Sequence, residues 1–268
     1  MALADVHAHL THSALQEQLP QVVARAHAAG LSSVVSNGLN PADNEATLEL
    51  AKEYALVKPA LGFYPVDVVL SDMRAHDVDY PRQDTEFSAE QGVSWLEQHA
   101  HEAFAIGEIG LDGYWVPEFL WPKQEDVFRT LVRLAIGHHK AVIIHSRKRE
   151  RRAFEILQEQ GAQRVNWHCF GGKVKLARAI AHEPGQYFSI PATARRSQSF
   201  TRMLQTLPRE RLLLETDCPY LGPERGVANE PGNVRGTLRY AAELWGVNES
   251  EAERQFAANF EALFGVQP

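Results

Sequence analysis

Six residues of this chain carry side chains that commonly bind divalent metal ions. They are His7, His9, Glu108, His145, His168 and Asp217. Imidazole and carboxylate groups are the usual protein ligands of such ions. Four imidazoles and two carboxylates are enough for two ions with positions left open for water. A pair of ions generates a hydroxide at neutral pH and stabilises both the attacking and the leaving oxygen, so these residues indicate hydrolysis if the fold brings them together.

Glu108 lies between two glycines, directly after a short apolar stretch. Residues Ala103–Ile106 predict a buried strand, because the stretch is short, apolar and followed by Gly107. Gly107 and Gly110 allow the backbone to turn sharply or to approach another segment closely. A buried carboxylate needs a cation or hydrogen-bond donors around it. Glu108 is therefore expected either to bind metal or to accept hydrogen bonds from loop amides.

The fold that must position these residues is indicated by an alternation of strands and helices over 268 residues. The expected strands are Ala2–Leu10, Leu31–Ser36, Val57–Phe63, Ala103–Ile106, Ala141–Ile144, Arg164–Trp167, Gln186–Ile190 and Arg211–Glu215. The expected helices are Ser13–Ala29, Pro41–Ala55, Val93–His101, Gln124–His139, Lys148–Gln160, Lys173–His182, Ser197–Leu207, Asn233–Trp245 and Glu249–Phe264. Residues 64–91 are polar and indicate a long loop with one helical turn. The pattern predicts an α/β protein, a (β/α)8 TIM barrel forming one domain over residues 1–268.

Barrels of this kind have their active sites at the C-terminal ends of the strands. The candidate ligands follow that rule: His7 and His9 come late in the first strand, Glu108 after the fourth, His145 after the fifth, His168 after the sixth and Asp217 after the eighth. A single histidine at a strand end is commonly a hydrogen-bonded core residue. Four of them with two carboxylates at the same end favour a metal site.

The ligands are expected to divide between two ions. His7, His9 and Asp217 form one set, because the first and eighth strands adjoin when the barrel closes. His145 and His168 form the other set, because the fifth and sixth strands are neighbours.

Glu108, from the middle of the barrel order, is expected to bridge the ions. Glu108 and Asp217 are also the predicted catalytic residues, with Asp217 orienting or deprotonating the attacking water. Carboxylates and a phosphate substrate favour two magnesium or manganese ions, whereas imidazoles favour zinc or another transition metal.

Basic residues follow three of the predicted strands and are candidates for contacts with phosphate. Arg147 comes two residues after His145, Lys173 follows a pair of glycines, and Arg195 follows the seventh strand. The alternative is that such residues lie on solvated helix faces. Tyr114, Trp115 and Trp121, which follow Glu108, either stack on bases or pack in the core.

Composition excludes several classes of protein. The formal net charge of −7 argues against a broadly basic surface that wraps nucleic acid, although it allows a local basic rim. No apolar run approaches the roughly 20 residues that cross a bilayer, and no secretory signal is recognisable, so no membrane association is expected. Two cysteines provide no disulfide framework, which favours the cytoplasm. No feature indicates a stable protein partner.

The ordered motifs resemble those of the TatD family of metal-dependent deoxyribonucleases. The matching segments are Asp5–Leu10, Gly107–Asp112, His145–Arg147, His168–Phe170, Glu215–Leu221, Asn229–Asn233 and Asn259–Phe264. The resemblance spans nearly the whole chain. It implies a (β/α)8 barrel, two divalent ions held by the same six ligands, and hydrolysis of DNA phosphodiesters, often from the 3′ end.

Two segments depart from the family pattern. The usual Gly-x-His-Pro-His turn after the third strand is replaced here by residues 62–66, with Tyr64 in place of the first histidine. Thr11 replaces an aspartate that usually follows the first-strand motif. Tyr64 donates a hydrogen bond but carries no positive charge at neutral pH. We expect Tyr64 to contact substrate, so that the departures change substrate preference rather than metal binding.

The expected function is a metal-dependent deoxyribonuclease, a 3′–5′ exonuclease that prefers single-stranded or frayed ends. An amidohydrolase-type enzyme that hydrolyses a small-molecule ester, lactone or amide is the alternative. A third possibility is a non-catalytic scaffold stabilised by metal. The basic residues near the predicted site favour phosphate chemistry.

Overall fold

The computed structural model describes residues 3–81 and 87–268. Its single sheet has eight strands, which pair in parallel and in chain order. They are β1 (Leu3–Ala8), β2 (Leu31–Asn37), β3 (Val57–Leu61), β4 (Ala105–Asp112), β5 (Ala141–Arg147), β6 (Val165–Trp167), β7 (Gln186–Ile190) and β8 (Leu212–Leu214). Ala2, where we expected the first strand to begin, lies outside the described residues.

The segment after β8 returns to β1 and closes the sheet. The backbone N–H of Asp217 donates to the carbonyl of His7 at 2.8 Å, and the N–H of His9 donates to the carbonyl of Cys218 at 2.9 Å. Ala8 and Cys218 form a parallel bridge between these segments. The predicted single-domain (β/α)8 barrel is confirmed.

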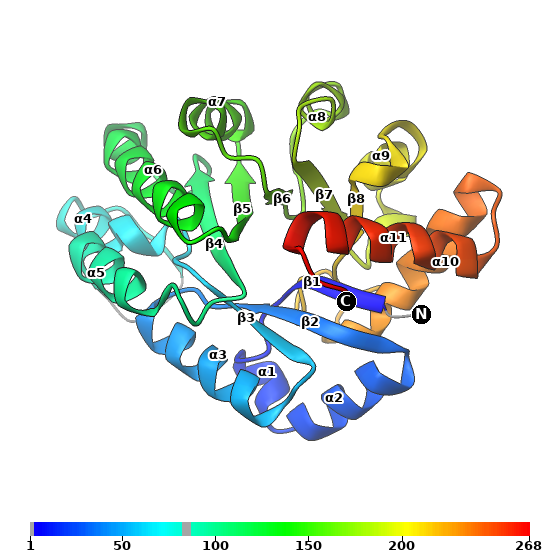
Figure 1. Ribbon diagram of the computed structural model, residues 1–268. Coiled ribbons are helices and arrows are strands. Elements are labelled where there is room, and N and C mark those ends of the chain that lie inside the picture. Colours follow the sequence, from blue (N-terminus) through cyan, green and yellow to red (C-terminus); the bar gives the residue numbers. More distant parts are fainter. Residues whose placement is uncertain (1–2, 82–86) are drawn as a thin grey trace.

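The helices surround the strands (Figure 1). They are α1 (Ser13–Gln16), α2 (Leu19–Ala28), α3 (Pro41–Glu53), α4 (Leu70–Ala75), α5 (Ala89–His99), α6 (Trp121–Gly137), α7 (Glu150–Gln160), α8 (Val174–Ala181), α9 (Gln198–Thr206), α10 (Val234–Trp245) and α11 (Glu249–Phe264). None of the helices in the described part of the chain has both the length and the apolar character needed to cross a bilayer.

Two helical regions differ from the sequence prediction. The expected helix Ser13–Ala29 is divided into α1 and α2, since Pro20 stands in the first turn of α2 and lacks the N–H that a continuous helix would use. The expected loop 64–91 contains a short 3-10 helix, Asp67–Val69, followed by α4. The large apolar residues of α4, Leu70 and Met73, are buried and pack this helix against the barrel. Residues 82–86 of that loop lie outside the described part.

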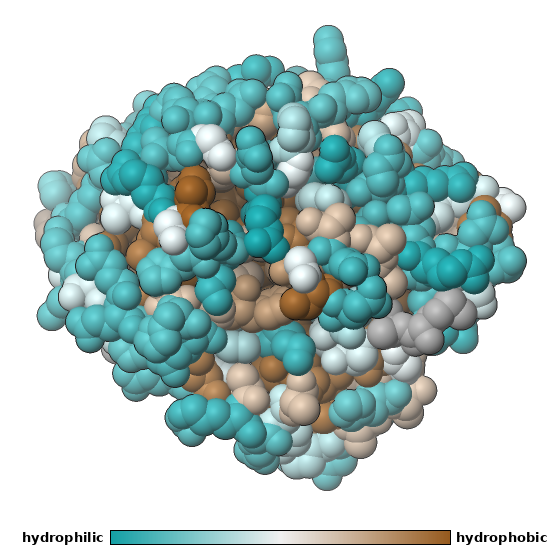
Figure 2. Space-filling view, viewed as in Figure 1, coloured by the Kyte–Doolittle hydropathy of each residue, from teal (hydrophilic) through white to brown (hydrophobic). Residues whose placement is uncertain are grey.

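Alternate strand residues face two hydrophobic clusters. The inner cluster fills the barrel and includes Ala4, Val35, Ala60, Ala105, Ile143 and Leu213. Phe260, Leu263 and Phe264 of α11 join it, so this helix closes the end of the barrel where the strands begin (Figure 1). The outer cluster packs the other faces of the strands against the helices. In the view of Figure 1, the surface of the molecule is mostly hydrophilic, with hydrophobic residues visible chiefly toward the middle (Figure 2).

Two strands contain an extra residue next to candidate ligands. Between Asp5 and Ala8, β1 advances three residues while β2 advances two, from Val34 to Ser36. Between Ile106 and Ile109, β4 likewise advances three residues while β5 advances two. Such bulges re-aim the side chains that follow them. They lie where the chain presents His7 and Glu108.

Candidate metal centre

The six candidate ligands converge at the C-terminal ends of the strands. His7 lies in β1 and His9 directly follows it, Glu108 lies in β4, His145 in β5, His168 follows β6 and Asp217 follows β8. Their side chains are largely or fully buried.

Glu108 and His145 lie within strands, whereas the sequence predicted both strands to end before them. Pairing continues beyond Ile106, with Gly110 opposite His145 and Asp112 opposite Arg147. Gly110 permits this close approach, because its φ is +150° and an added Cβ would lie 1.9 Å from the carbonyl oxygen of His145. The glycine after Glu108 therefore extends the strand instead of ending it.

His7, His9 and Asp217 form one compact group. The Nε2 atoms of His7 and His9 are 3.2 Å apart, and Oδ1 of Asp217 lies 3.6 Å from the first and 3.4 Å from the second. The Nδ1 atom of His9 lies 3.0 Å from the carbonyl oxygen of Asn37. A proton on Nδ1 satisfies that contact and leaves the Nε2 lone pair of His9 directed into the group.

The two carboxylate oxygens of Glu108 face different pairs of imidazoles. Oε2 lies 3.5 Å from Nε2 of His7 and 3.6 Å from Nε2 of His9. Oε1 lies 2.8 Å from Nδ1 of His145 and 3.7 Å from Nε2 of His168. Glu108 thus stands between the first-strand histidines and those of the fifth and sixth strands.

Both candidate catalytic carboxylates have lowered pKa values. Burial raises the pKa of Glu108, but hydrogen bonds with His145 and His7 outweigh burial and bring it well below its usual range. Burial also raises the pKa of Asp217, and a hydrogen bond with His9 together with nearby imidazole charge brings it below its ordinary value. Both groups are therefore anionic at neutral pH.

Three buried acids support the candidate ligands, and sequence reasoning assigned them no role. Glu215 faces Nδ1 of His168 at 3.3 Å. Burial lowers the pKa of this imidazole, but the charge and hydrogen bond of Glu215 raise it to about 10. Asp112 lies 3.1 Å from Nε2 of His145 and accepts the backbone N–H groups of residues 114 and 115. Carboxylates behind ligand imidazoles orient the rings.

The third acid, Asp5, joins the first strand to the segment after the last. It accepts hydrogen bonds from the backbone N–H of His7 at 3.2 Å and of Thr216 at 3.0 Å. Burial raises its pKa well above the usual range. The sequence did offer a signal, because each of the three acids stands within four residues of a candidate ligand.

The arrangement fits divalent cations. Two groups of three side chains each present ligand atoms within 4.8 Å of one another: His7 with His9 and Asp217, and His7 with Glu108 and His168. Anionic oxygens and imidazole nitrogens directed at a common point leave a position that a cation satisfies. His145 belongs to neither group, although its Nδ1 faces Glu108 and its Nε2 faces Asp112, so its role as a ligand stays a prediction.

The profile described as "TatD related DNase" matches residues 4–265 of the chain. The chain belongs to this family. It is 32% identical over 274 aligned positions to "Uncharacterized metal-dependent hydrolase YabD" of Bacillus subtilis, covering 98% of this chain and 99% of that protein.

One further relative and one solved structure are also similar to the chain. The chain is 30% identical over 270 aligned positions to "Deoxyribonuclease TATDN3" of Homo sapiens, with 98% of this chain and 95% of that protein covered. The crystal structure of YJJV, a TatD homologue from Escherichia coli, matches with a TM-score of 0.84 at 23% identity, covering 98% of each chain. The last likeness shows the shared fold.

A cavity of about 370 Å³ opens above the candidate ligands of this TatD-family barrel. All six except His7 line it, and the other lining residues include Tyr64, Tyr80, Trp115, Arg147 and Tyr220. The ring of Tyr64 meets that of His145 edge-on, with the centroids 4.9 Å apart. Aromatic side chains and one arginine therefore surround the metal-binding groups.

Only two of the four predicted substrate contacts lie at this cavity, namely Tyr64 and Arg147. Lys173 lines a separate groove at the start of α8. Arg195 forms an ion pair with Glu243, and its guanidinium lies 4.4 Å from the ring centroid of Tyr240. The position of Arg195 after β7 was predicted correctly, but its side chain turns toward α10.

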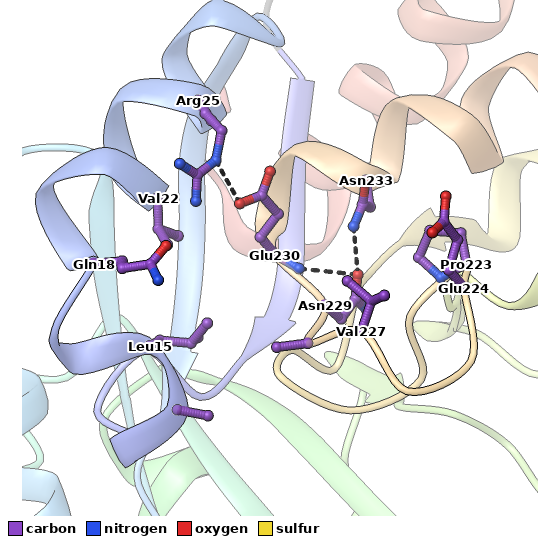
Figure 3. A pocket seen from close by; sticks show the side chains of 12 residues that line it. Leu15, Gln18, Val22, Arg25, Pro223, Glu224, Val227, Asn229, Glu230 and Asn233 are labelled. Carbon is purple, nitrogen blue, oxygen red and sulfur yellow. Dashed lines mark hydrogen bonds and ion pairs between the residues drawn. The ribbon is translucent and has the colours of Figure 1, made fainter.

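Asn229 belongs to the segment Asn229–Asn233, which matches the TatD family pattern. This segment lines a second cavity, of about 410 Å³, between α1, α2 and the loop after β8 (Figure 3). The carbonyl oxygen of the Asn229 side chain accepts from the N–H of Glu230 at 3.0 Å and from Asn233 at 2.8 Å. Its amide donates to the carbonyls of Thr216 and Tyr220, both at 2.8 Å. Asn229 thus fixes the loop that carries Tyr220 to the candidate metal centre.

Proposed function

We propose that this TatD-family protein is a metal-dependent deoxyribonuclease that removes nucleotides from the 3′ ends of single-stranded or frayed DNA. The observation that carries the proposal is the position of Glu108, whose two oxygens face separate pairs of imidazoles. A carboxylate in that position suits a bridge between two cations. Its family membership supports DNA as the substrate, and the 3′ polarity rests on the sequence resemblance.

The residues that would hold the ions divide as the strands do. His7, His9 and Asp217 would hold one ion, His145 and His168 the other, and Glu108 would contact both. Ions bound there would activate a water molecule and offset the charge that develops on the phosphate. Carboxylates and a phosphate substrate favour magnesium or manganese in use, while the imidazoles also accept zinc.

The protein's own groups supply the remaining steps. Asp217 is anionic, and its Oδ1 lies within 3.6 Å of both first-strand imidazoles, so it is placed to orient an entering water and accept its proton. Arg147 at the cavity wall offers a fixed positive charge to a phosphate oxygen. The aromatic side chains offer faces on which a terminal base stacks.

The size of the cavity favours a strand end. At about 370 Å³ it is near the lower end of the roughly 300–1,000 Å³ typical of small-molecule sites. A nucleotide at the end of a flexible strand enters such a space, whereas an intact duplex is too wide to descend into it. The proposed enzyme therefore acts on single strands or frayed ends.

A nuclease assay on end-labelled DNA tests the proposal. Single- and double-stranded substrates labelled at the 5′ end are incubated with magnesium, manganese or zinc, and progressive shortening of the labelled strand is expected for the single strand. The Glu108→Ala protein is the control for contaminating nuclease. If a matched panel of esters, lactones and amides is hydrolysed and DNA is not, the alternative amidohydrolase function replaces the proposed one.

A further inference from the structure

A groove of about 550 Å³ lies beside the candidate metal centre, between the first turns of α7 and α8. We call it the basic groove; its lining includes Trp121, Lys148, Arg149, Arg151, Arg152 and Lys173. Arg147, the last residue of β5, lines the cavity, and the next residue, Lys148, lines the groove. The two spaces are therefore adjacent along the end of β5.

Three cations of the basic groove are available to a ligand. Lys148, Arg151 and Lys173 are exposed, and within residues 3–81 and 87–268 none of them forms an ion pair with a carboxylate. Arg149 and Arg152 are already paired with Glu125.

Two acidic residues, Glu150 and Glu155, also line the groove, but they do not cancel its positive charge. Glu155 is paired with Arg152 at 3.1 Å, and Glu150 accepts the backbone N–H of Lys148 at 3.1 Å. Because Arg149 and Arg152 are paired with carboxylates, the positive charge of this region comes from Lys148, Arg151 and Lys173, on a chain with a net charge of −7. A positive strip on an acidic protein raises the local concentration of anions.

Tyr114 contacts one cation of each space. The residue is 46% exposed, the guanidinium of Arg147 lies 3.7 Å from its ring centroid, and the ammonium of Lys148 lies 4.7 Å from it. Deeper in the groove, the guanidinium of Arg149 lies 4.0 Å from the ring of Trp121. Aromatic faces interleaved with cations are the surface that binds single-stranded nucleic acid, since bases stack and phosphates pair with the cations.

We infer that the basic groove binds the phosphates of a DNA single strand on the side away from the nucleotide held in the cavity. The strand passes from the metal centre over Arg147 and Tyr114 to Lys148, Arg151 and Lys173. This inference rests on the proposed function and adds the path of the substrate to it. Its consequence is that a longer strand binds better than a dinucleotide, and that the groove provides the difference.

The experiment compares two substrates in one set of variants. One is a dinucleotide with a single phosphodiester, and the other is a single strand of about ten nucleotides, within the roughly 4–16 nucleotides that single-strand sites cover. The length preference is the ratio of kcat/KM for the longer substrate to that for the dinucleotide. The Lys148→Glu, Arg151→Glu protein tests the groove, and Lys173→Glu tests its other wall. Arg178→Glu with Arg202→Glu is the matched control, since both arginines are exposed on α8 and α9 and neither lines the groove.

The groove variants are expected to lose about tenfold in length preference, and the double variant is expected to have a log–log salt slope shallower by about 1.4, from two contacts of about 0.7 each. The control is expected to keep both values. An unchanged length preference in the groove variants of an active nuclease overturns the inference and leaves the proposed function standing. If the wild type cleaves neither substrate, the proposed function fails. Fluorescence anisotropy with the labelled longer strand then decides separately on the groove, and equal affinities in wild type and groove variants overturn the inference.

Discussion

The carboxylate of Glu215 lies 3.3 Å from Nδ1 of His168, the ring nitrogen that faces away from Glu108, and orients that imidazole. Its own position is fixed by the backbone N–H of Cys169 at 2.8 Å and by the hydroxyl of Ser189 at 2.6 Å. In the neutral imidazole that cation binding requires, a proton on Nδ1 leaves the Nε2 lone pair facing Glu108, whose Oε1 is 3.7 Å away. Glu215 therefore positions a candidate ligand without belonging to the ligand set itself.

Replacing Glu215 by glutamine is expected to weaken metal binding by about 10–100-fold, the cost typical of losing a carboxylate behind a ligand imidazole. The amide oxygen still accepts a hydrogen bond but lacks the negative charge of the carboxylate, so it stabilises a proton on Nδ1 of His168 less and holds the ring less firmly. Calorimetric titration with manganese and with zinc measures the affinity. Ser189→Ala is expected to cost less, because it removes one hydrogen bond to Glu215 and keeps the carboxylate. Equal affinities in the glutamine variant and the wild type would contradict this role of Glu215.

Glu108→Ala is expected to abolish hydrolysis and to lower the metal content of the purified protein. One side chain faces all four imidazoles, so its removal takes a shared carboxylate from both proposed ions. Elemental analysis after dialysis gives the number of ions per chain. Two ions retained by the Glu108→Ala protein would show that the bridging assignment is wrong.

The sequence was sufficient for the barrel and for the strand ends at which the candidate ligands gather, because both follow from the alternation of elements. It did not predict the bulges. Strict alternation would place Val6 and Ala8 on one face of β1, but Val6 joins the inner cluster and Ala8 the outer one. The extra residue is visible only in the pairing of β1 with β2. The sequence also did not predict the directions of the side chains. That of Arg195 points toward Glu243.

Gly110→Ala is expected to destabilise the protein by about 3 kcal/mol, in the range of strained backbone conformations and severe core clashes. The new Cβ would meet the carbonyl of His145 at 1.9 Å, on a backbone with a φ of +150°. Gly137→Ala is the matched control, since a Cβ at that helical residue meets nothing within 4 Å. Its stability is expected to rise by up to about 1 kcal/mol. Chemical denaturation measures both variants, and equal stabilities would refute the close-approach explanation.

Asp217→Asn is expected to fold normally and to lose at least about 10²–10⁴ in turnover, the usual contribution of a general base. The backbone at Asp217 has a φ of 58°, and asparagine tolerates this left-handed region as well as aspartate does. The amide keeps an acceptor oxygen but does not take a proton from water. Thermal unfolding checks the fold, and kcat on labelled DNA checks the chemistry. Near-normal turnover would exclude Asp217 as the base.

The last prediction concerns how the substrate reaches the centre. The candidate ligands are largely buried beneath a cavity of about 370 Å³, and within the described residues the cations near it without a carboxylate partner are Arg147, Lys148, Arg151 and Lys173. A strand whose end enters this space needs only about two to four phosphate contacts, so the dependence of binding on salt is expected to be shallow, at about 0.7 in the log–log slope for each contact. A covalently closed single-stranded circle has no end to insert and is expected to be cut far more slowly than the linear strand of the same sequence. A single endonucleolytic nick introduced beforehand should restore the rate of the linear form. Equal initial rates on the closed and linear strands would rule out entry by the end of the strand.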